Sequence, residues 1–403
     1  MSYNYPVRIN LKKAFSGISI STVFLGLTSL FADISTEMLY PVLPIFLTET
    51  LKAGGSIVGI IEGIAEATQN IVQGLSGWLS DKLQKRKAIA LVGYTLAALS
   101  KPLIGTASIW QQVLAGRFLD RLGTGIRSAP RDALIASSVA QENRGKAFGF
   151  EGIGDNLGAF AGPLVAIILL FYFRINIRFV FYFAVIPGLL AALMMVFVKE
   201  KSIKIAAKAK LDIKIKQFPK QYWRYLFAIG LFAVGNSSNA FLILQAKSVG
   251  LSLISTILVY AVFNLIAALI SYPSGFLSDK FGRKTILLAS FFIFFVTYLG
   301  FALTSNIYLI GFLFILYGLY QGIFRAVGKA YATDFVPQHL RASGVGWYSM
   351  VVGLCGLFAS VVAGQLWDRI NHPAVFFYGA FFAVVGSLGL QFLAKSNKAL
   401  DYH

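Results

Sequence analysis

The feature that most limits the fold of this chain is a succession of apolar runs, each near 20 residues long and separated by short polar turns. About 20 apolar residues in a helix cross the roughly 30 Å hydrocarbon layer of a bilayer, so each run predicts a membrane-spanning helix. The runs lie near residues 17–47, 56–80, 88–107, 109–138, 146–171, 178–198, 223–247, 253–278, 285–304, 307–336, 343–367 and 373–394. The sequence therefore predicts an all-α integral membrane protein with twelve transmembrane helices.

Composition and charge support this prediction. Apolar residues make up 57% of the chain and charged residues only 13%, too few to cover a soluble protein of this length. The net charge is +19, but the basic residues lie mostly in short loops, as in the topology signal of membrane proteins. We therefore expect membrane lipid, and no nucleic acid, as a macromolecular partner.

Basic residues also predict the orientation in the membrane, because they gather in alternate loops. The loops rich in lysine and arginine lie at residues 82–87, 144–146, 199–220, 280–284 and 395–398. The alternate loops contain few basic residues, namely Lys52, Arg174, Arg178, Lys247 and Arg369. The rich loops should face the cytoplasm. We expect a multi-pass protein of the bacterial cytoplasmic (inner) membrane with both termini in the cytoplasm.

One change in composition divides the chain near its middle. The segment from Lys199 to Lys220 carries eight lysines against Glu200 and Asp212. It predicts a cytoplasmic linker at 199–222, between a six-helix bundle at 1–198 and a second one at 223–403. The linker either lies on anionic lipid or only enforces the topology.

An internal repeat relates the two bundles. The segment Gly77-Trp-Leu-Ser-Asp-Lys82 returns as Gly275-Phe-Leu-Ser-Asp-Lys280, shifted by 198 residues. Each copy ends the second apolar run of its half and starts a basic turn. Such repeats are typical of transporters whose two bundles move about a central site.

These segments resemble the signature of the major facilitator superfamily, Gly-x-Leu-x-Asp-Arg/Lys-x-Gly-Arg-Lys. The copy from Gly275 to Lys284 matches it at nearly every position, whereas the first copy has Gln84 where the family prefers glycine. The resemblance covers the whole chain and implies two pseudo-symmetric six-helix bundles, usually in a monomer. It also implies a gating latch between helices, formed here by Asp81, Arg86, Asp279, Arg283 and Lys284. The simpler interpretation is that these charges end helices and fix the topology.

Acidic residues inside the predicted spans are candidates for proton coupling, because a charge at the bilayer centre costs about 2.5–3.5 kcal/mol. Asp33 and Glu37 are four residues apart on one helix face, where their repulsion favours a proton on one of them. Glu66 follows Glu62 at the same spacing, and Glu62 lies near the outer end, where water can solvate it. We expect Asp33, Glu37 and Glu66 to couple transport to protons; the alternative is structural pairing with basic residues.

Cations of the fourth and tenth spans are candidates for the solute cavity. Either Arg117 or Arg121 fits the buried arginine that the family often has early in its fourth helix, with Asp33 and Glu37 as its natural partners. Shifted by 198 residues, Arg127 falls on Arg325 and Arg131 on Lys329, while the seventh span offers amides in place of acids. The predicted cavity residues are Arg117, Arg121, Arg127, Arg131, Asn236, Asn239, Arg325 and Lys329.

The fifth span holds a stripe of small residues, Gly154, Gly158 and Gly162, followed by Pro163. Small residues every four positions allow close helix packing. A Gly-x-x-x-Gly-Pro segment in this span also resembles the family's antiporter motif, although its usual trailing Gly-Gly is absent. Glu151 and Asp155 of the same span are further candidate partners for the arginines of the fourth span.

Other classes of protein are less compatible with the sequence. The histidines lie in predicted loops or the tail, and no HExxH, Gly-x-Ser-x-Gly or Walker A motif is present. We therefore expect no enzyme, no metal and no cofactor. The predicted function is secondary active transport of a small solute by alternating access, as proton-coupled efflux (antiport). The alternatives are proton-coupled uptake (symport) of an organic anion or zwitterion, and a channel or uncoupled facilitator.

Overall fold

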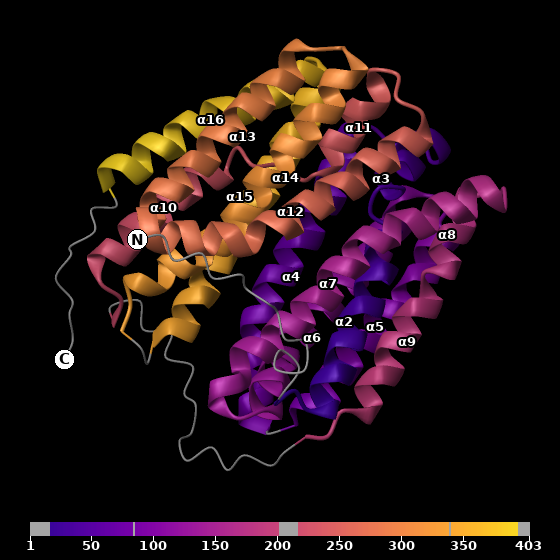
Figure 1. Cartoon of the computed structure of the whole chain (residues 1–403). Coiled ribbons are helices and arrows are strands. Elements are labelled where there is room, and N and C mark those ends of the chain that lie inside the picture. The colour runs from indigo at the N-terminus through magenta and orange to yellow at the C-terminus, as the bar shows by residue number, and fades with distance from the viewer. Residues whose placement is uncertain (1–16, 84, 201–216, 338–339, 394–403) are drawn as a thin grey trace, which may run out of the picture.

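The computed structural model describes residues 17–83, 85–200, 217–337 and 340–393, apart from the side chains of Trp78, Asp81 and Ala342. Every regular element in these ranges is a helix, and the helices form two bundles (Figure 1). In Figure 1 the first bundle runs from indigo to magenta and the second from orange to yellow. The predicted all-α membrane fold with two related halves is therefore confirmed.

The first half contains six spans, of which the first, the fifth and the sixth are made of consecutive shorter pieces. Its elements are α2 (Ile20–Glu37), α3 (Leu43–Ile45), η1 (Phe46–Thr50), α4 (Gly55–Leu83), α5 (Arg86–Thr106), α6 (Trp110–Ser138), η2 (Gln141–Asn143), α7 (Arg144–Ile167), η3 (Ile168–Tyr172), α8 (Ile177–Phe183) and α9 (Val185–Phe197).

The second half repeats this order, with its first span divided in two. Its elements are α10 (Lys220–Ala233), α11 (Ala240–Ser248), α12 (Leu253–Phe281), α13 (Arg283–Leu303), α14 (Ile307–Asp334), α15 (Arg341–Arg369) and α16 (His372–Leu393).

Helix packing follows the same plan in both halves. In the first half α2 packs on α7 and α9, and α6 packs on α4 and α5. In the second half α10 packs on α15 and α16, and α14 packs on α12 and α13. The halves meet where α4 lies along α15 and α7 along α12, so each half lends the same two helices to the interface.

Eight of the described helices are long and apolar enough to cross a membrane by length and composition. The four remaining spans of the fold are the first, second, fourth and seventh. Two of them, α4 and α6, carry charged residues along their length, and the other two are broken near their middle. Polar and broken helices in lipid need protein or water around them, so these four spans surround the interior of the protein.

The two breaks lie against each other between the two halves. The first span ends its regular helix at Glu37 and resumes at Leu43, while the seventh ends at Ala233 and resumes at Ala240. The hydroxyl groups of Tyr40 and Ser238 are hydrogen-bonded at 3.1 Å. These residues are 198 positions apart, which is the shift of the sequence repeat, so they lie near the axis that relates the halves.

We call the end of the bundle with residues 77–87 and 275–284 the signature end, and the opposite end the sealed end. At the sealed end the carboxylate of Asp368, on α15, accepts hydrogen bonds from the backbone N–H groups of Gly55 and Ser56, both at 2.8 Å. These groups begin α4 of the other half. Nearby, Lys247 of α11 forms an ion pair with Glu49 at 3.3 Å. Both contacts join the two halves.

Candidate functional site

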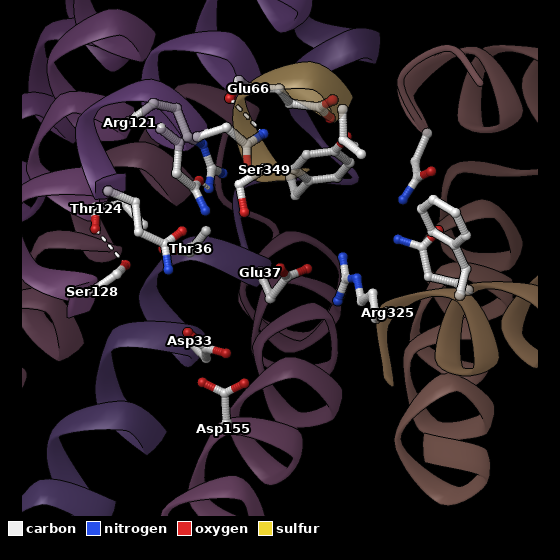
Figure 2. A pocket seen from close by; sticks show the side chains of 18 of the residues that line it. Asp33, Thr36, Glu37, Glu66, Arg121, Thr124, Ser128, Asp155, Arg325 and Ser349 are labelled. Carbon is white, nitrogen blue, oxygen red and sulfur yellow. Dashed lines mark hydrogen bonds between the residues drawn. The ribbon is translucent and has the colours of Figure 1, made fainter. Parts of the chain in front are cut away.

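A polar cavity lies between the two halves and is lined by residues of both (Figure 2). Its volume is about 480 Å³, a size typical of small-molecule sites. Of its lining residues only Phe324 and Val352 lack a polar side-chain atom. The lining continues to Gln73, Arg131 and Lys329 toward the signature end, whereas contacts between the halves close the sealed end. The cavity therefore opens toward the signature end.

Two carboxyl groups of α2 reach the cavity, on one helix face as predicted, but each has its own partner. Asp33 faces Asp155 of α7, and both side chains line the cavity (Figure 2). Glu37 accepts hydrogen bonds from Tyr260 Oη at 2.8 Å and Asn264 Nδ2 at 3.2 Å, both from α12 of the second half.

The two acidic residues of α4 also differ in their surroundings. Glu66 lines the cavity, whereas Glu62 is only 1% exposed and binds the Arg117 guanidinium through two hydrogen bonds of 2.9 and 2.8 Å. The interpretation of Glu62 as a solvated residue is therefore wrong. It lies within the packed contact between α4 and α6, where water does not reach it.

Arg117 is fully buried, as the resemblance implied for one of the two candidate arginines, but it does not line the cavity as predicted. Besides Glu62 it contacts Asp120, one turn along α6, at 2.9 Å. The expected pairing of Arg117 with Asp33 or Glu37 is wrong, since α6 packs along α4 and α5 and turns this arginine toward α4.

Arg121 and Arg127 lie one and about three turns further along α6, and both line the cavity. Arg121 donates to Gln69 Oε1 at 3.0 Å, and its Nε lies 3.5 Å from Asp120 Oδ2. Arg127 is 6% exposed, and its guanidinium carbon lies 4.5 Å from the centre of the Tyr94 ring. The acids expected as partners of Arg121 therefore pair elsewhere, and no carboxylate lies within ion-pair distance of Arg127 in the described chain.

Arg131 forms ion pairs with acidic residues of α7 that were predicted as candidate partners of Arg117 or Arg121. Its Nη1 lies 2.9 Å from Glu151 and 3.7 Å from Asp155, and its Nη2 lies 3.0 Å from Asp132. Ser29 donates to Glu151 at 2.6 Å and links this group to α2. Arg131 thus lies at the edge of the cavity within an ion-pair network that joins α2, α6 and α7.

The second half contributes cations and amides, and no carboxylate from its described residues lines the cavity. Arg325 and Lys329 project from α14 as exposed side chains, and Figure 2 shows Arg325 across the cavity from Glu37. Asn236 and Asn239 line it from the break between α10 and α11, where Asn239 accepts a hydrogen bond from Tyr317 at 2.7 Å.

Comparison with known proteins identifies this architecture. The family model of the Major Facilitator Superfamily matches residues 25–244 and 225–400. This chain belongs to the major facilitator superfamily. An uncharacterized MFS-type transporter from Methanocaldococcus jannaschii is 34% identical, over 93% of this chain and 95% of its own length. A probable 4-methylmuconolactone transporter from Cupriavidus pinatubonensis is 28% identical, over 85% of this chain and 84% of its own.

Solved structures agree on the fold. A mutant of the nucleoside transporter NupG matches with a TM-score of 0.78 and 15% identity, covering 93% of this chain and 100% of that chain. This likeness concerns the fold alone. The family and the relatives together make this protein a secondary transporter and not an enzyme.

The gating residues expected of a major facilitator superfamily transporter lie at the signature end. Arg283 donates to Asp334 at 2.6 Å and lies 3.7 Å from Asp279, which ties the start of α13 to the end of α14. Lys284 donates to the backbone oxygen of Gln391 at 2.8 Å.

The first signature copy is linked to the end of α9. The backbone N–H of Arg86 donates to Glu200 at 2.8 Å. The side chain of Asp81 lies outside the described part of the structure. In both copies the described contacts therefore lie within one half and not between the halves.

The glycine stripe of α7 faces α2, with no room for side chains. A methyl group on Gly154 or Gly158 would overlap the backbone oxygen of Gly26 or Leu30, and one on Gly162 would overlap the backbone of α2 near Met38. Pro163 is buried in the following turn of α7. This close packing brings Asp155 of α7 beside Asp33 of α2.

Sequence reasoning missed several polar residues of this transporter. Lys101 of α5 is 2% exposed, donates to Ser35 at 2.6 Å and lies 3.8 Å from Asp120. Its signal was present in the sequence, as a charged residue inside an apolar span. Tyr260 and Asn264 gave a weaker signal, because they occupy the positions of Glu62 and Glu66 after the 198-residue shift.

Proposed function

We propose that this secondary transporter moves a small polar solute in exchange for protons. The observation that carries the proposal is the pair of facing carboxyl groups, Asp33 and Asp155, at the wall of the cavity. Two carboxyl groups that lie next to each other retain a proton more readily than a single carboxyl group does. A group that gains and loses a proton inside the solute cavity is what coupling requires.

The cavity lining favours an anionic or zwitterionic solute. Arg325 and Lys329 are exposed in the cavity and have no carboxylate partner in the described chain, so they are available to an anionic group. Opposite them, Glu37 and Glu66 can receive a cationic group. A lipophilic drug fits poorly, because polar side chains dominate the lining.

Efflux by antiport is the direction that we propose. Its support is the antiporter-like glycine motif of α7, in which Gly158 packs directly on Asp33, so motif and proton site form one contact. Proton-driven uptake is the second candidate, favoured by the cations of the second half. By the distribution of basic residues the signature end faces the cytoplasm, and the cavity is then open to the cell interior.

Proton flux in proteoliposomes tests the proposal. A pH-sensitive dye would report proton movement while organic anions and zwitterions are added under an imposed pH gradient. Solute-dependent flux should disappear in Asp33→Asn and in Asp155→Asn while solute binding persists. The control is Glu142→Gln, an exposed acid outside the cavity.

The sign of the flux decides between the two directions. Protons that move against the solute indicate antiport, and protons that move with it indicate symport. Labelled solute crossing without protons, or full coupling in Asp33→Asn, would refute the proposal and make these acids structural.

A further inference from the structure

A second and much smaller void lies inside the first half, behind the wall of the cavity. Its volume is about 10 Å³, roughly the space of one water molecule or one small ion. Its lining comes from α2, α5, α6 and α9, and its polar members are Thr36, Tyr94, Lys101 and Arg127. Thr36 and Arg127 also line the cavity, so the void adjoins it.

The polar atoms around this void are hydrogen-bond donors without acceptors. Arg127 Nε and Nη1 and Tyr94 Oη are buried and have no hydrogen-bond partner in the described structure. Lys101 Nζ carries three N–H groups but donates at hydrogen-bond distance only to Ser35 Oγ. That hydroxyl is itself committed to the backbone oxygen of Ala184. A buried donor without a hydrogen-bond partner destabilises the folded state, so an acceptor in the void would stabilise these donors.

The charge around the void points the same way. Two cations line it and no carboxylate does. The nearest acid on this side, Asp120, is 3.8 Å from Lys101 and shares its other oxygen with Arg117 and Arg121. The charge of Arg127 thus remains without a direct counter-charge among the described residues, and Lys101 shares its one partner, Asp120, with Arg117 and Arg121 in a low-dielectric interior.

We propose that this void binds a small monovalent anion, chloride, between Lys101, Arg127 and Tyr94. A water molecule fits the site less well, because its two hydrogens need acceptors and only the hydroxyl groups of Tyr94 and Thr36 can serve. An anion accepts from all the free donors at once. By holding the Arg127 guanidinium from behind, the anion fixes that side chain in the cavity wall. This inference does not depend on which solute is carried or on proton coupling.

Thermal unfolding of the purified full-length protein in detergent tests this site without a known solute. Chloride is titrated against gluconate, which is too large for the void, at constant ionic strength. The unfolding temperature should rise with chloride and saturate, because a ligand that binds only the folded state stabilises it. The same temperature in both salts would overturn the proposal.

Variants locate the effect. Lys101→Met keeps the length of the side chain and should abolish the chloride dependence, whereas Lys220→Met, at an exposed position at the start of α10, should retain it. Tyr94→Phe removes one hydroxyl group, which should weaken chloride binding and raise the half-saturating chloride concentration several-fold. This second variant keeps the test valid if Lys101→Met folds poorly. Full chloride dependence in a folded Lys101→Met would refute the site.

Bromide supplies a direct readout. Crystals grown in bromide should give an anomalous peak within hydrogen-bond reach of Lys101 Nζ and the Arg127 guanidinium. Density there without an anomalous signal would identify a water molecule and overturn the proposal.

Discussion

The contact between Asp368 and the start of α4 should stabilise the conformation in which the sealed end is closed. Its carboxylate caps a helix of the opposite half through two N–H groups, at Gly55 and Ser56. Loss of a capping side chain costs about 0.5–2 kcal/mol. Because this cap exists only while the halves touch, Asp368→Ala should remove that free energy from the closed state. The equilibrium should then shift by about 2- to 30-fold toward opening at the sealed end.

Double electron–electron resonance can measure this shift. Spin labels at Thr50 and Arg369 would report the distance across the sealed end, since both positions are exposed and lie on opposite halves. Cys355 must first be replaced, because it is the single native cysteine. We expect a longer-distance population that grows in Asp368→Ala under otherwise identical conditions.

The matched control is Glu49→Ala, which breaks the other described contact between the halves at this end, the ion pair with Lys247. Exposed ion pairs contribute about 0–1 kcal/mol, so this variant should shift the distances less than Asp368→Ala. Equal distance distributions in wild type and Asp368→Ala would refute the reasoning, because the cap would then contribute nothing to closure.

Two further predictions concern stability. Glu62→Gln removes the carboxylate that binds the fully buried Arg117 through two hydrogen bonds, and leaves Arg117 to share Asp120 with other cations. It should lower the free energy of unfolding by about 3–5 kcal/mol, seen as a large drop in unfolding temperature; an unchanged temperature would contradict the pairing. Gly158→Leu forces a side chain against α2 and should destabilise by at least about 1–3 kcal/mol. Gly152→Leu on the open face of α7 should be nearly neutral, and equal losses in the two variants would contradict the packing.

The fold was predictable because its signals are long and repeated. Span length, the alternation of basic loops and the 198-residue repeat each depend on many residues, so single misreadings matter little. The repeat even relates Tyr40 to Ser238, whose hydroxyl groups are hydrogen-bonded between the two halves. The divisions of the first and seventh spans are less visible, because short breaks hardly change the mean hydropathy of a span.

The pairing of charges was less predictable, because it depends on how neighbouring helices are rotated. The family resemblance placed Arg117 among the candidate cavity residues, but the face of α6 that carries it turns toward α4 and Glu62. The acids of α7, offered to Arg117 or Arg121, contact Arg131 instead. A periodicity of 100° per residue groups residues on one helix and says nothing about which neighbour that face meets.

The two halves share a backbone plan but differ in what fills their interiors. In the first half, the contact between α4 and α6 is ionic, with Arg117 held by Glu62 and Asp120. In the second, the equivalent contact between α12 and α14 is aromatic: Tyr260 replaces Glu62 and packs on Phe263, which in turn packs on Tyr317.

This difference gives the halves different parts in transport. The acids of the cavity lining belong to the first half, while the described residues of the second half contribute cations, amides and aromatic side chains. Glu37 joins the two, because its carboxylate accepts hydrogen bonds from Tyr260 and Asn264 across the interface. A proton on Glu37 would weaken the hydrogen bonds that its carboxylate accepts from the second half. Protonation in the first half can therefore act on the contact between the halves without any intermediate movement.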